Sequence, residues 1–262
     1  MKLSMKKRFI IRLLKIFISI FFVLIQLLIN SLRNILKLNT YRIVILYYHG
    51  ISEKDFLDFQ KQIIFIQNFA NFIGPEGQFN YSKSINVLLT FDDGLKSIKT
   101  HIEPFLTNLE IPFLIFIPTG YFGKTPDWEI DSEFKRVLER VMTKEEVLSL
   151  NKKFCFIGSH TINHPHLTNL KEDQIFTELV ESKNVLEELL NSKIRYLSFP
   201  YGNYNQNIVR LSLEVGYEKV FTIEPGNIPV NWNSVILNRI SASPKDWKIE
   251  TLLKLLGGYN WQ

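Results

Sequence analysis

Short apolar stretches alternate with longer amphipathic ones through most of this chain, and that alternation restricts the folds open to it. Apolar stretches of about four to eight residues, rich in β-branched and aromatic side chains, have the length and composition of buried strands. We predict strands of this kind at residues 42–48, 86–91, 113–117, 154–158, 195–199, 218–223 and 234–240.

Amphipathic segments lie between these strands. Residues 55–70 and 171–191 repeat apolar side chains at helical spacing. Thr143 followed by Glu146 is the signature of a capping box and predicts a short helix there, and Gly216 is placed to end a helix that begins near residue 205. Strand, helix and strand repeated this often predict an α/β fold with a mostly parallel sheet, open or closed into a barrel.

Polar residues follow several of the predicted strands at the point where each strand stops. His49 follows the first strand, Asp92 and Asp93 the second, His160 the fourth and Tyr201 the fifth. The carboxyl ends of parallel strands gather at one rim, where α/β proteins place their active sites. We therefore expect these distant segments to deliver their polar groups to one place.

The first of these groups is a pair of adjacent carboxylates, Asp92 and Asp93, followed by Gly94. In a regular strand neighbouring side chains face opposite ways, but glycine permits a sharp turn that could bring both carboxylates to the same rim. The alternative is an acidic turn that caps the following helix.

A second group is a loop with paired imidazoles. His160 and His164 are four residues apart, and Pro165 disfavours a continuing helix, so a loop presents them. Two imidazoles with a carboxylate available elsewhere favour a metal site with two nitrogen ligands and one oxygen ligand. We assign His166 a supporting or structural role, and His101 a surface or packing role.

Two further strand ends carry candidate groups. Pro200, Tyr201 and Gly202 form a stiff turn that could aim backbone N–H groups inward, as an oxyanion site requires, although Pro and Gly mark many ordinary turns. His49 alone would be unremarkable, but beside the other groups on this rim it becomes a candidate proton donor.

The N-terminal segment differs in composition from the rest. Residues 1–42 contain nine Lys and Arg and no acid, which leaves 22 basic against 26 acidic residues in the remainder, so we expect no nucleic-acid partner. The apolar run 16–29, extended upstream to residue 9, is long enough to cross a bilayer if Arg12 and Lys15 snorkel.

We predict that residues 1–40 form a membrane anchor segment that contacts lipid, and that residues 41–262 form the catalytic domain. More bases precede the run than follow it, which favours a single-pass anchor with an extracytoplasmic domain. A helix lying in the membrane interface is the alternative. Cys155 is the only cysteine, so the chain has no internal disulfide and no cysteine-based zinc site.

Taken together, these segments resemble the polysaccharide deacetylase family, the NodB-homology domain of carbohydrate esterase family four, from about residue 41 to residue 240. Residues 90–94 resemble its first motif, which implies that Asp92 is the catalytic base and Asp93 a metal ligand. Residues 160–165 resemble the second motif, which implies that His160 and His164 bind the metal. Residues 199–202 resemble the third, which lines the groove.

The resemblance implies a distorted (β/α) barrel of about seven parallel strands and a divalent metal ion, with Zn²⁺ expected and Co²⁺ or Ni²⁺ possible. It places Pro200, Tyr201 and Arg239 on the substrate side of the site. The family's third motif usually has an Arg before the Pro, and its last motif a His; here Ser198-Phe199 and Leu237-Asn238-Arg239-Ile240 stand instead.

Both departures resemble the branch that acts on exopolysaccharides such as poly-N-acetylglucosamine, in which the His of the first strand replaces the missing acid. His49 is then the general acid. Arg239 either replaces the tethering Arg or forms a rim salt bridge without catalytic consequence.

The expected function is metal-dependent removal of N-acetyl groups from amino sugars of a cell-surface or exported polysaccharide. Two alternatives are a deformylase or deacylase of a lipid-linked amino sugar and a non-catalytic saccharide-binding relative.

Overall fold

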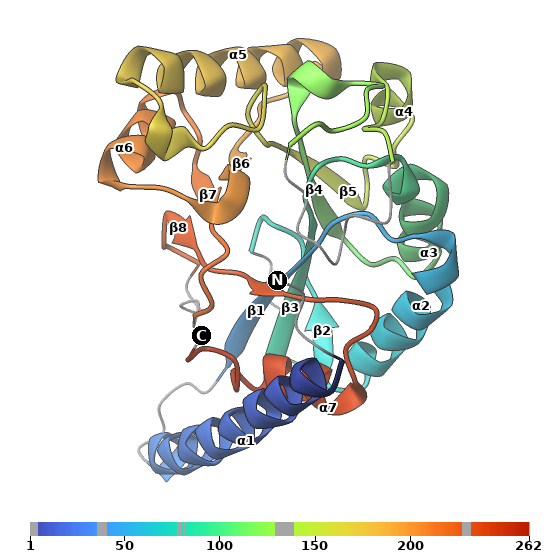
Figure 1. Cartoon of the computed structure of the whole chain (residues 1–262), viewed down its shortest axis with the longest axis vertical. Helices are drawn as coiled ribbons and strands as arrows, with labels where there is room; N and C mark the ends of the chain where they lie inside the picture. The colour runs from blue at the N-terminus through green and yellow to red at the C-terminus, as the bar shows by residue number, and fades with distance from the viewer. Residues whose placement is uncertain are drawn as a thin grey trace.

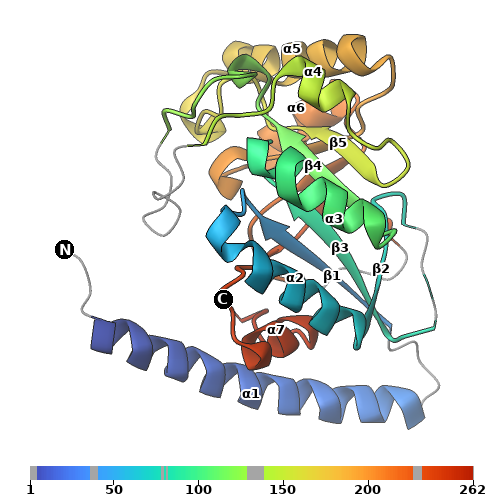
Figure 2. The ribbon, with the colours of Figure 1, turned by 90° about the vertical axis from the view of Figure 1, so that its right-hand side faces the viewer.

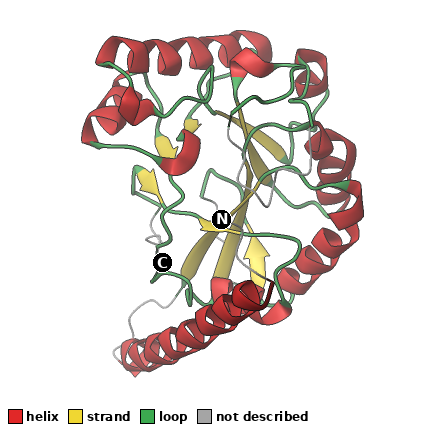
Figure 3. Ribbon diagram, viewed as in Figure 1, coloured by secondary structure: helices red, strands yellow, loops and turns green. Residues whose placement is uncertain are grey.

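The computed structural model of the chain describes residues 5–35, 41–77, 80, 82–128, 139–226 and 232–261. Within them a single curved sheet is wrapped by helices on its outer side (Figures 1 and 3). The strands are β1 (Arg42–Tyr48), β2 (Ala70–Phe72), β3 (Ile85–Phe91), β4 (Phe113–Ile117), β5 (Cys155–Ser159), β6 (Tyr196–Ser198), β7 (Lys219–Phe221), β8 (Ile236–Leu237) and β9 (Ile240–Ser241). The α-helices are α1 (Met5–Ile35), α2 (Glu53–Gln67), α3 (Glu103–Asn108), α4 (Lys144–Leu148), α5 (Glu172–Leu190), α6 (Gln206–Glu214) and α7 (Lys248–Leu255).

All strand pairs in this sheet are parallel, in the order β8-β7-β6-β5-β4-β3-β1-β9, with β2 beside β3. β8 and β9 lie at opposite ends of this order, although only Asn238 and Arg239 separate them along the chain. These two residues therefore cross the gap between the sheet edges. The prediction of a distorted parallel barrel is confirmed.

Two local predictions differ from the structure. The strand expected at 234–240 is two short strands, because the chain leaves β7 at Asn238 and joins β1 at Ile240. β2 was not predicted, since Ala70 was placed in the helix 55–70, which instead ends at Gln67.

Both faces of the central strands are buried, which explains why their sequences read as continuous apolar runs. Ile43 and Ile45 of β1 point into the barrel interior with Leu88 and Phe116, whereas Val44 and its alternate neighbours pack beneath the helices. Each such side chain contributes about 1.5–3 kcal/mol through burial. The rigid sheet thus fixes the positions of the loops that follow its strands.

The helix ends predicted from the capping residues are present in the structure. α4 begins with a capping box, in which Glu146 N donates to Thr143 Oγ1 at 3.2 Å and Thr143 N donates to Glu146 Oε2 at 2.8 Å. Asn205 caps α6, and Gly216 follows this helix with a φ of +96°.

The N-terminal helix α1 is apolar and long enough between Lys6 and Ile29 to cross a membrane, judged by length and composition. It lies along α7 on the outside of the domain, as both views show (Figures 1 and 2).

Candidate functional site

Three side chains from two strand ends meet at the carboxyl rim of the barrel. Asp93 follows β3, and His160 and His164 lie on the loop that follows β5. One carboxylate oxygen of Asp93, Oδ1, lies 3.6 Å from the Nε2 atom of each imidazole. All three side chains are buried, and their ligand atoms lie within 4.8 Å of one another.

The arrangement suits a divalent cation better than a set of direct hydrogen bonds. Two ligand atoms that each lie about 2.0–2.2 Å from the same ion are separated from each other by roughly the distance that separates Asp93 Oδ1 from the imidazole Nε2 atoms. Asp93 Oδ1 and His164 Nδ1 are buried and make no hydrogen bond among the described residues. A buried polar atom without a partner is costly, and a cation between the three side chains would compensate the carboxylate.

Both imidazoles are prepared to act as neutral ligands. His160 Nδ1 donates to the carbonyl oxygen of Ser198 at 2.8 Å, which leaves the lone pair on Nε2, facing Asp93. Burial, with the nearby His160, lowers the pKa of His164 to about 2, so this ring is uncharged at neutral pH. Burial also raises the pKa of Asp93, a shift that a bound cation would oppose.

The turn after β3 separates the two carboxylates into different environments. Asp92 N donates to the carbonyl oxygen of Tyr48, whereas Asp93 and Gly94 adopt left-handed backbone with φ of 67° and 56°. A side chain at position 94 would lie 3.1 Å from Ile117, so both the turn and the packing there favour glycine.

Asp92 forms a bidentate ion pair with Arg239. Its Oδ1 and Oδ2 accept from Nη1 and Nη2 at 2.7 and 2.8 Å, and the Asp92 side chain is 4% exposed. Burial alone would raise the pKa of Asp92, but the charge of Arg239 and its hydrogen bonds to the carboxylate outweigh burial and help lower this pKa to about 2. Asp92 is therefore ionised and held in a fixed orientation.

Arg239 lies at the point where the barrel closes and is fully buried. Its remaining N–H groups donate to the Thr222 carbonyl oxygen, Thr90 Oγ1 and Ser198 Oγ, which belong to different parts of the sheet. Arg239 was expected on the substrate side, either tethering the base or at the rim. Its geometry is that of the tether, because the protein occupies all its donors.

The α-helix that follows the histidine loop, α5, stabilises the conformation of this loop. Glu178 of α5 accepts from the backbone N–H groups of Ile162 and Asn163 at 2.8 and 3.0 Å, and from Asn163 Nδ2 at 2.7 Å. Thr161 and His164 in this loop have left-handed backbone, with φ of 65° and 54°. These contacts stabilise a strained conformation that places both imidazoles toward Asp93.

Aromatic side chains surround His164 at the mouth of the site. Trp128 stacks on His164 with ring centroids 4.2 Å apart, and Tyr201 meets it edge-on at 4.7 Å. His166 is exposed and stacks on Tyr201 at 3.7 Å, which agrees with the supporting role expected for it. Sequence reasoning did not single out Trp128 among the tryptophans, and it did not identify Glu178.

Of the other candidate residues, His49, Pro200 and Tyr201 lie at this site, whereas His101 and Cys155 lie away from it. His49 is 28% exposed, with Nε2 4.0 Å from Asp93 Oδ2. Pro200 is buried, and Tyr201 is half-buried with a φ of 58° in the turn after β6. His101 packs against Phe56 on the outer side, and Cys155 is buried, with its thiol pKa raised by burial.

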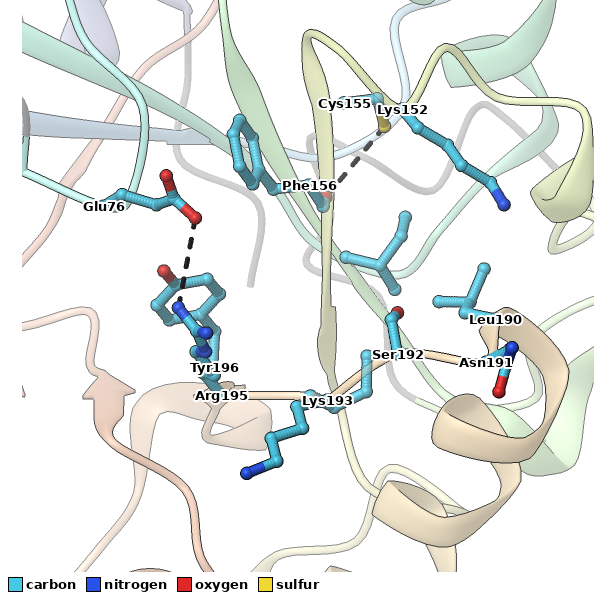
Figure 4. A pocket seen from close by; sticks show the side chains of 12 residues that line it. Glu76, Lys152, Cys155, Phe156, Leu190, Asn191, Ser192, Lys193, Arg195 and Tyr196 are labelled. Atoms are coloured by element: carbon cyan, nitrogen blue, oxygen red, sulfur yellow. Dashed lines mark hydrogen bonds and ion pairs between the residues drawn. The ribbon is translucent and has the colours of Figure 1, made fainter.

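A separate hollow lies at the opposite end of the barrel (Figure 4). Cys155 and Tyr196, the first residues of β5 and β6, line it together with Glu76 and Arg195. Since β5 and β6 run from this hollow toward the His–Asp cluster, it is not part of the candidate site.

The sequence matches a known family over more than half of its length. Residues 80–220 match the family model described as polysaccharide deacetylase. The chain is 26% identical over 158 residues to YxkH of Bacillus subtilis (strain 168), whose name assigns it provisionally to the polysaccharide deacetylases; the match covers 60% of this chain and 52% of that protein. It is 24% identical over 176 residues to the poly-beta-1,6-N-acetyl-D-glucosamine N-deacetylase of Staphylococcus aureus (strain MSSA476), covering 67% of this chain and 60% of that protein.

The chain spans between about half and three fifths of the length of these curated relatives. Among solved structures, IcaB from Ammonifex degensii superimposes with a TM-score of 0.67 at 23% identity, over 82% of this chain and 97% of that one. This likeness establishes a shared fold. With the family match across the strands that carry Asp92, Asp93, His160 and His164, it identifies the chain as a member of the polysaccharide deacetylase family.

Proposed function

We propose that this protein is a metal-dependent hydrolase that removes N-acetyl groups from amino sugars of a cell-surface or exported polysaccharide. The observation that carries the proposal is the buried group of Asp93, His160 and His164, with the ionised Asp92 beside it. Two nitrogen ligands and one oxygen ligand leave coordination positions open for reactants, as catalytic metal sites require.

The ligand set favours Zn²⁺, with Co²⁺ or Ni²⁺ as alternatives. A divalent ion held there would polarise the amide carbonyl of the substrate and lower the pKa of the attacking water. Asp93, His160 and His164 would hold this ion, and Glu178 and Ser198 would keep the two imidazoles oriented.

Asp92 is proposed as the general base. Its carboxylate is ionised and fixed by Arg239, so it can accept the proton of the water that attacks the acetyl carbonyl. Fixing the base before the reaction removes the entropy cost of orienting it during the reaction. Arg239 acts through Asp92 and does not itself touch the substrate.

His49 is proposed as the general acid that protonates the departing amine. Its side chain is partly exposed and lies near Oδ2 of Asp93, whereas the buried histidines lie near Oδ1, so His49 is accessible to a substrate that reaches the site. Pro200 and Tyr201 are proposed to line the groove, with the Tyr201 N–H donating to the developing oxyanion.

The proposed substrate class rests on the relatives. The names of curated relatives describe deacetylases of peptidoglycan N-acetylglucosamine and of poly-beta-1,6-N-acetyl-D-glucosamine. A polymer rich in N-acetylated amino sugar is therefore the first substrate to test. We also propose that α1 attaches the domain to a membrane and that the domain lies outside the cytoplasm.

The test is acetate release from a panel of N- and O-acetylated glycans, with and without a chelator. We expect release from N-acetylglucosamine polymers that stops on chelation and returns with Zn²⁺ or Co²⁺. Asp92→Asn should abolish turnover and leave metal content near normal. Full activity in Asp92→Asn, or glycan binding without acetate release at saturating Zn²⁺, would overturn the proposal.

A second candidate function is removal of a formyl or acyl group from a lipid-linked amino sugar. The apolar helix α1 favours it, because a membrane-attached enzyme meets such a substrate at the bilayer. Comparing acetate and formate release from polymer and from an undecaprenyl-linked amino sugar separates the two functions.

A further inference from the structure

The polar residues of α1 follow a heptad spacing that the apolar run conceals. Between residues 9 and 29 the polar side chains are Arg12, Lys15, Ser19 and Gln26, and three of these lie seven residues apart. Residues seven apart share one face of a helix. We call this the docked face of α1 and define it as Arg12, Ile16, Ser19, Val23 and Gln26.

The docked face packs on α7 and the C-terminal turn through specific contacts. Arg12 Nε donates to Glu250 Oε1 at 2.8 Å, Arg12 Nη2 donates to the Lys245 carbonyl oxygen at 2.8 Å, and the guanidinium lies 4.2 Å from the Trp247 ring centroid. Trp261 Nε1 donates to Ser19 Oγ at 3.1 Å. Arg12 therefore has its partners on the protein, at Lys245, Trp247 and Glu250, and its side chain does not extend to a membrane surface.

The packing is also close at the backbone. A side-chain carbon at Gly258 would lie 2.9 Å from Val23 Cγ2 and 3.0 Å from the Ser19 carbonyl oxygen, closer than real contacts of this kind. Ile16 and Val23 are buried, and Ser19 is fully buried. The contacts extend from Arg12 to Val23, which is about 16 Å along a helix.

Apart from Lys15, the rest of the run from Phe9 to Ile29 is apolar and mostly exposed, although the Phe9 ring lies against Trp247 with ring centroids 6.1 Å apart. Fourteen large apolar side chains are more than a third exposed: Phe9, Ile10, Ile11, Leu13, Leu14, Phe17, Ile18, Ile20, Phe21, Leu24, Ile25, Leu27, Leu28 and Ile29. At the start of α7, the N-cap residue Trp247 and Ile249 are each 39% exposed. An apolar surface of this size marks a binding site for another apolar phase.

A spanning α1 cannot keep these contacts. The docked face occupies the middle of the run from Phe9 to Ile29, which a spanning helix would place in the hydrocarbon core. Glu250 and Lys245 would then enter the core with it, and a charged side chain there costs about 2.5–3.5 kcal/mol or more. The contacts with α7 and a transmembrane orientation are mutually exclusive.

We propose that α1 lies in the plane of one leaflet of an anionic bilayer, with its docked face on the protein and its other faces in the acyl chains. Lys6, Lys7 and Arg8 precede the apolar run, and residues 1–42 contain no acid, which complements anionic headgroups. A second copy on the same surface would bring like charges together. The proposal replaces the expected single-pass orientation and does not depend on the chemistry of the site.

The orientation places the candidate active site beside the bilayer. The segment that contacts Arg12 follows β9, which pairs with β1, the strand that leads to His49. The rim of the barrel would then lie next to the membrane surface.

The first test uses the two ends of the helix in membranes of cells that produce the full chain. Met5→Cys and Ser31→Cys, near the two ends of α1, are labelled separately with a membrane-impermeant maleimide, in spheroplasts and in inverted vesicles. An in-plane helix places both positions on the same side, so both label in the same preparation. Cys155 is buried, so the unsubstituted chain gives the background. Labelling of the two positions from opposite sides would overturn the proposal.

The second test cross-links the docked face. Ser19→Cys combined with Trp261→Cys should be joined by a short bifunctional thiol cross-linker in these membranes, because the two side chains face each other across a 3.1 Å hydrogen bond. Phe21→Cys with Trp261→Cys should not be joined, because Phe21 is 63% exposed on another face. Equal cross-linking in both pairs contradicts the docked geometry. Recovery of the chain as a soluble dimer that does not co-sediment with phosphatidylglycerol vesicles would show a second copy as the partner and overturn the bilayer assignment.

Discussion

The two ends of the barrel differ in how completely their buried polar groups are hydrogen-bonded. At the carboxyl rim, Asp93 Oδ1 and His164 Nδ1 are buried without a hydrogen-bond partner among the described residues. Asp93, Thr161, His164 and Tyr201 also have left-handed backbone there, a conformation that costs non-glycine residues about 1–3 kcal/mol each. Unpaired ligand atoms and left-handed backbone therefore occur side by side at the rim.

At the amino end the corresponding groups are mostly satisfied. Glu110, Asn191 and Trp232 also have left-handed backbone there, but none of them is among the described residues with an unpaired buried side-chain atom, and Trp232 Nε1 donates to the Pro75 carbonyl oxygen at 3.0 Å. Lys219 Nζ donates to two carbonyl oxygens, and Arg195 pairs with Glu76 beside the hollow of Figure 4. Arg42 is an exception, since its Nη1 has no hydrogen-bond partner. The difference indicates that the carboxyl rim is built for a ligand that supplies the missing interactions, and the amino end for stability.

The largest expected effect follows from removing a proposed ligand at the rim. His164→Ala should lose bound metal and deacetylase activity together. Zn²⁺ should raise the melting temperature of the parent protein but not that of the variant. At a Zn²⁺ concentration one hundred times the dissociation constant, binding should add about 2.7 kcal/mol to the free energy of unfolding of the parent. Metal content and thermal unfolding measure both effects.

His166→Ala is the matched control, because His166 is exposed and stacks on Tyr201 instead of facing Asp93. It should keep its metal. Metal loss in the control but not in His164→Ala would reverse the assignment of the two histidines.

Local sequence patterns were sufficient for most of the strands, β2 and the break between β8 and β9 excepted, and for the meeting of Asp93 with His160 and His164, because parallel strands bring their carboxyl ends to one rim. They were not sufficient for the groups that support the rim. Glu178 lies in an amphipathic helix among other acids, and only the packing of α5 against the loop after β5 shows its role. The crossing at Asn238 and Arg239 depends on the closure of the whole sheet. These are long-range arrangements without a local signature.

Removal of the tether of Asp92 is expected to act mainly on the stability of the fold. Arg239→Met leaves a buried, unpaired carboxylate, which should cost about 3–5 kcal/mol in the free energy of unfolding, measured with urea. Asp92→Asn combined with Arg239→Met removes the buried charge and should recover part of that loss. If Arg239→Met alone lowers the free energy of unfolding by less than about 1 kcal/mol, the ion pair with Asp92 adds little to the stability of the fold.

The support of the histidine loop should have a still smaller effect on stability. Glu178→Gln weakens charge-assisted hydrogen bonds from Ile162 and Asn163, at a cost of about 1–3 kcal/mol. Because the loop carries both imidazoles, metal affinity should fall by about 10–100-fold, as measured by competition with a chromogenic chelator. Glu181→Gln on the exposed side of the same helix is the control and should change neither quantity. Unchanged metal affinity in Glu178→Gln would limit this residue to a structural role.

The smallest effect is expected at the amino end of the barrel. Trp232→Phe keeps an aromatic ring of similar shape in the interior cluster but removes the donor to the Pro75 carbonyl oxygen, at a cost of about 1 kcal/mol. Since this end of the barrel is distant from the proposed ligands, the rate of acetate release and the metal content should not change. Urea unfolding and the acetate assay on the same preparation measure the two quantities. A loss of activity at full metal occupancy would mean that the amino end also positions the reacting groups, and the division between a reactive end and a stabilising end would have to be abandoned.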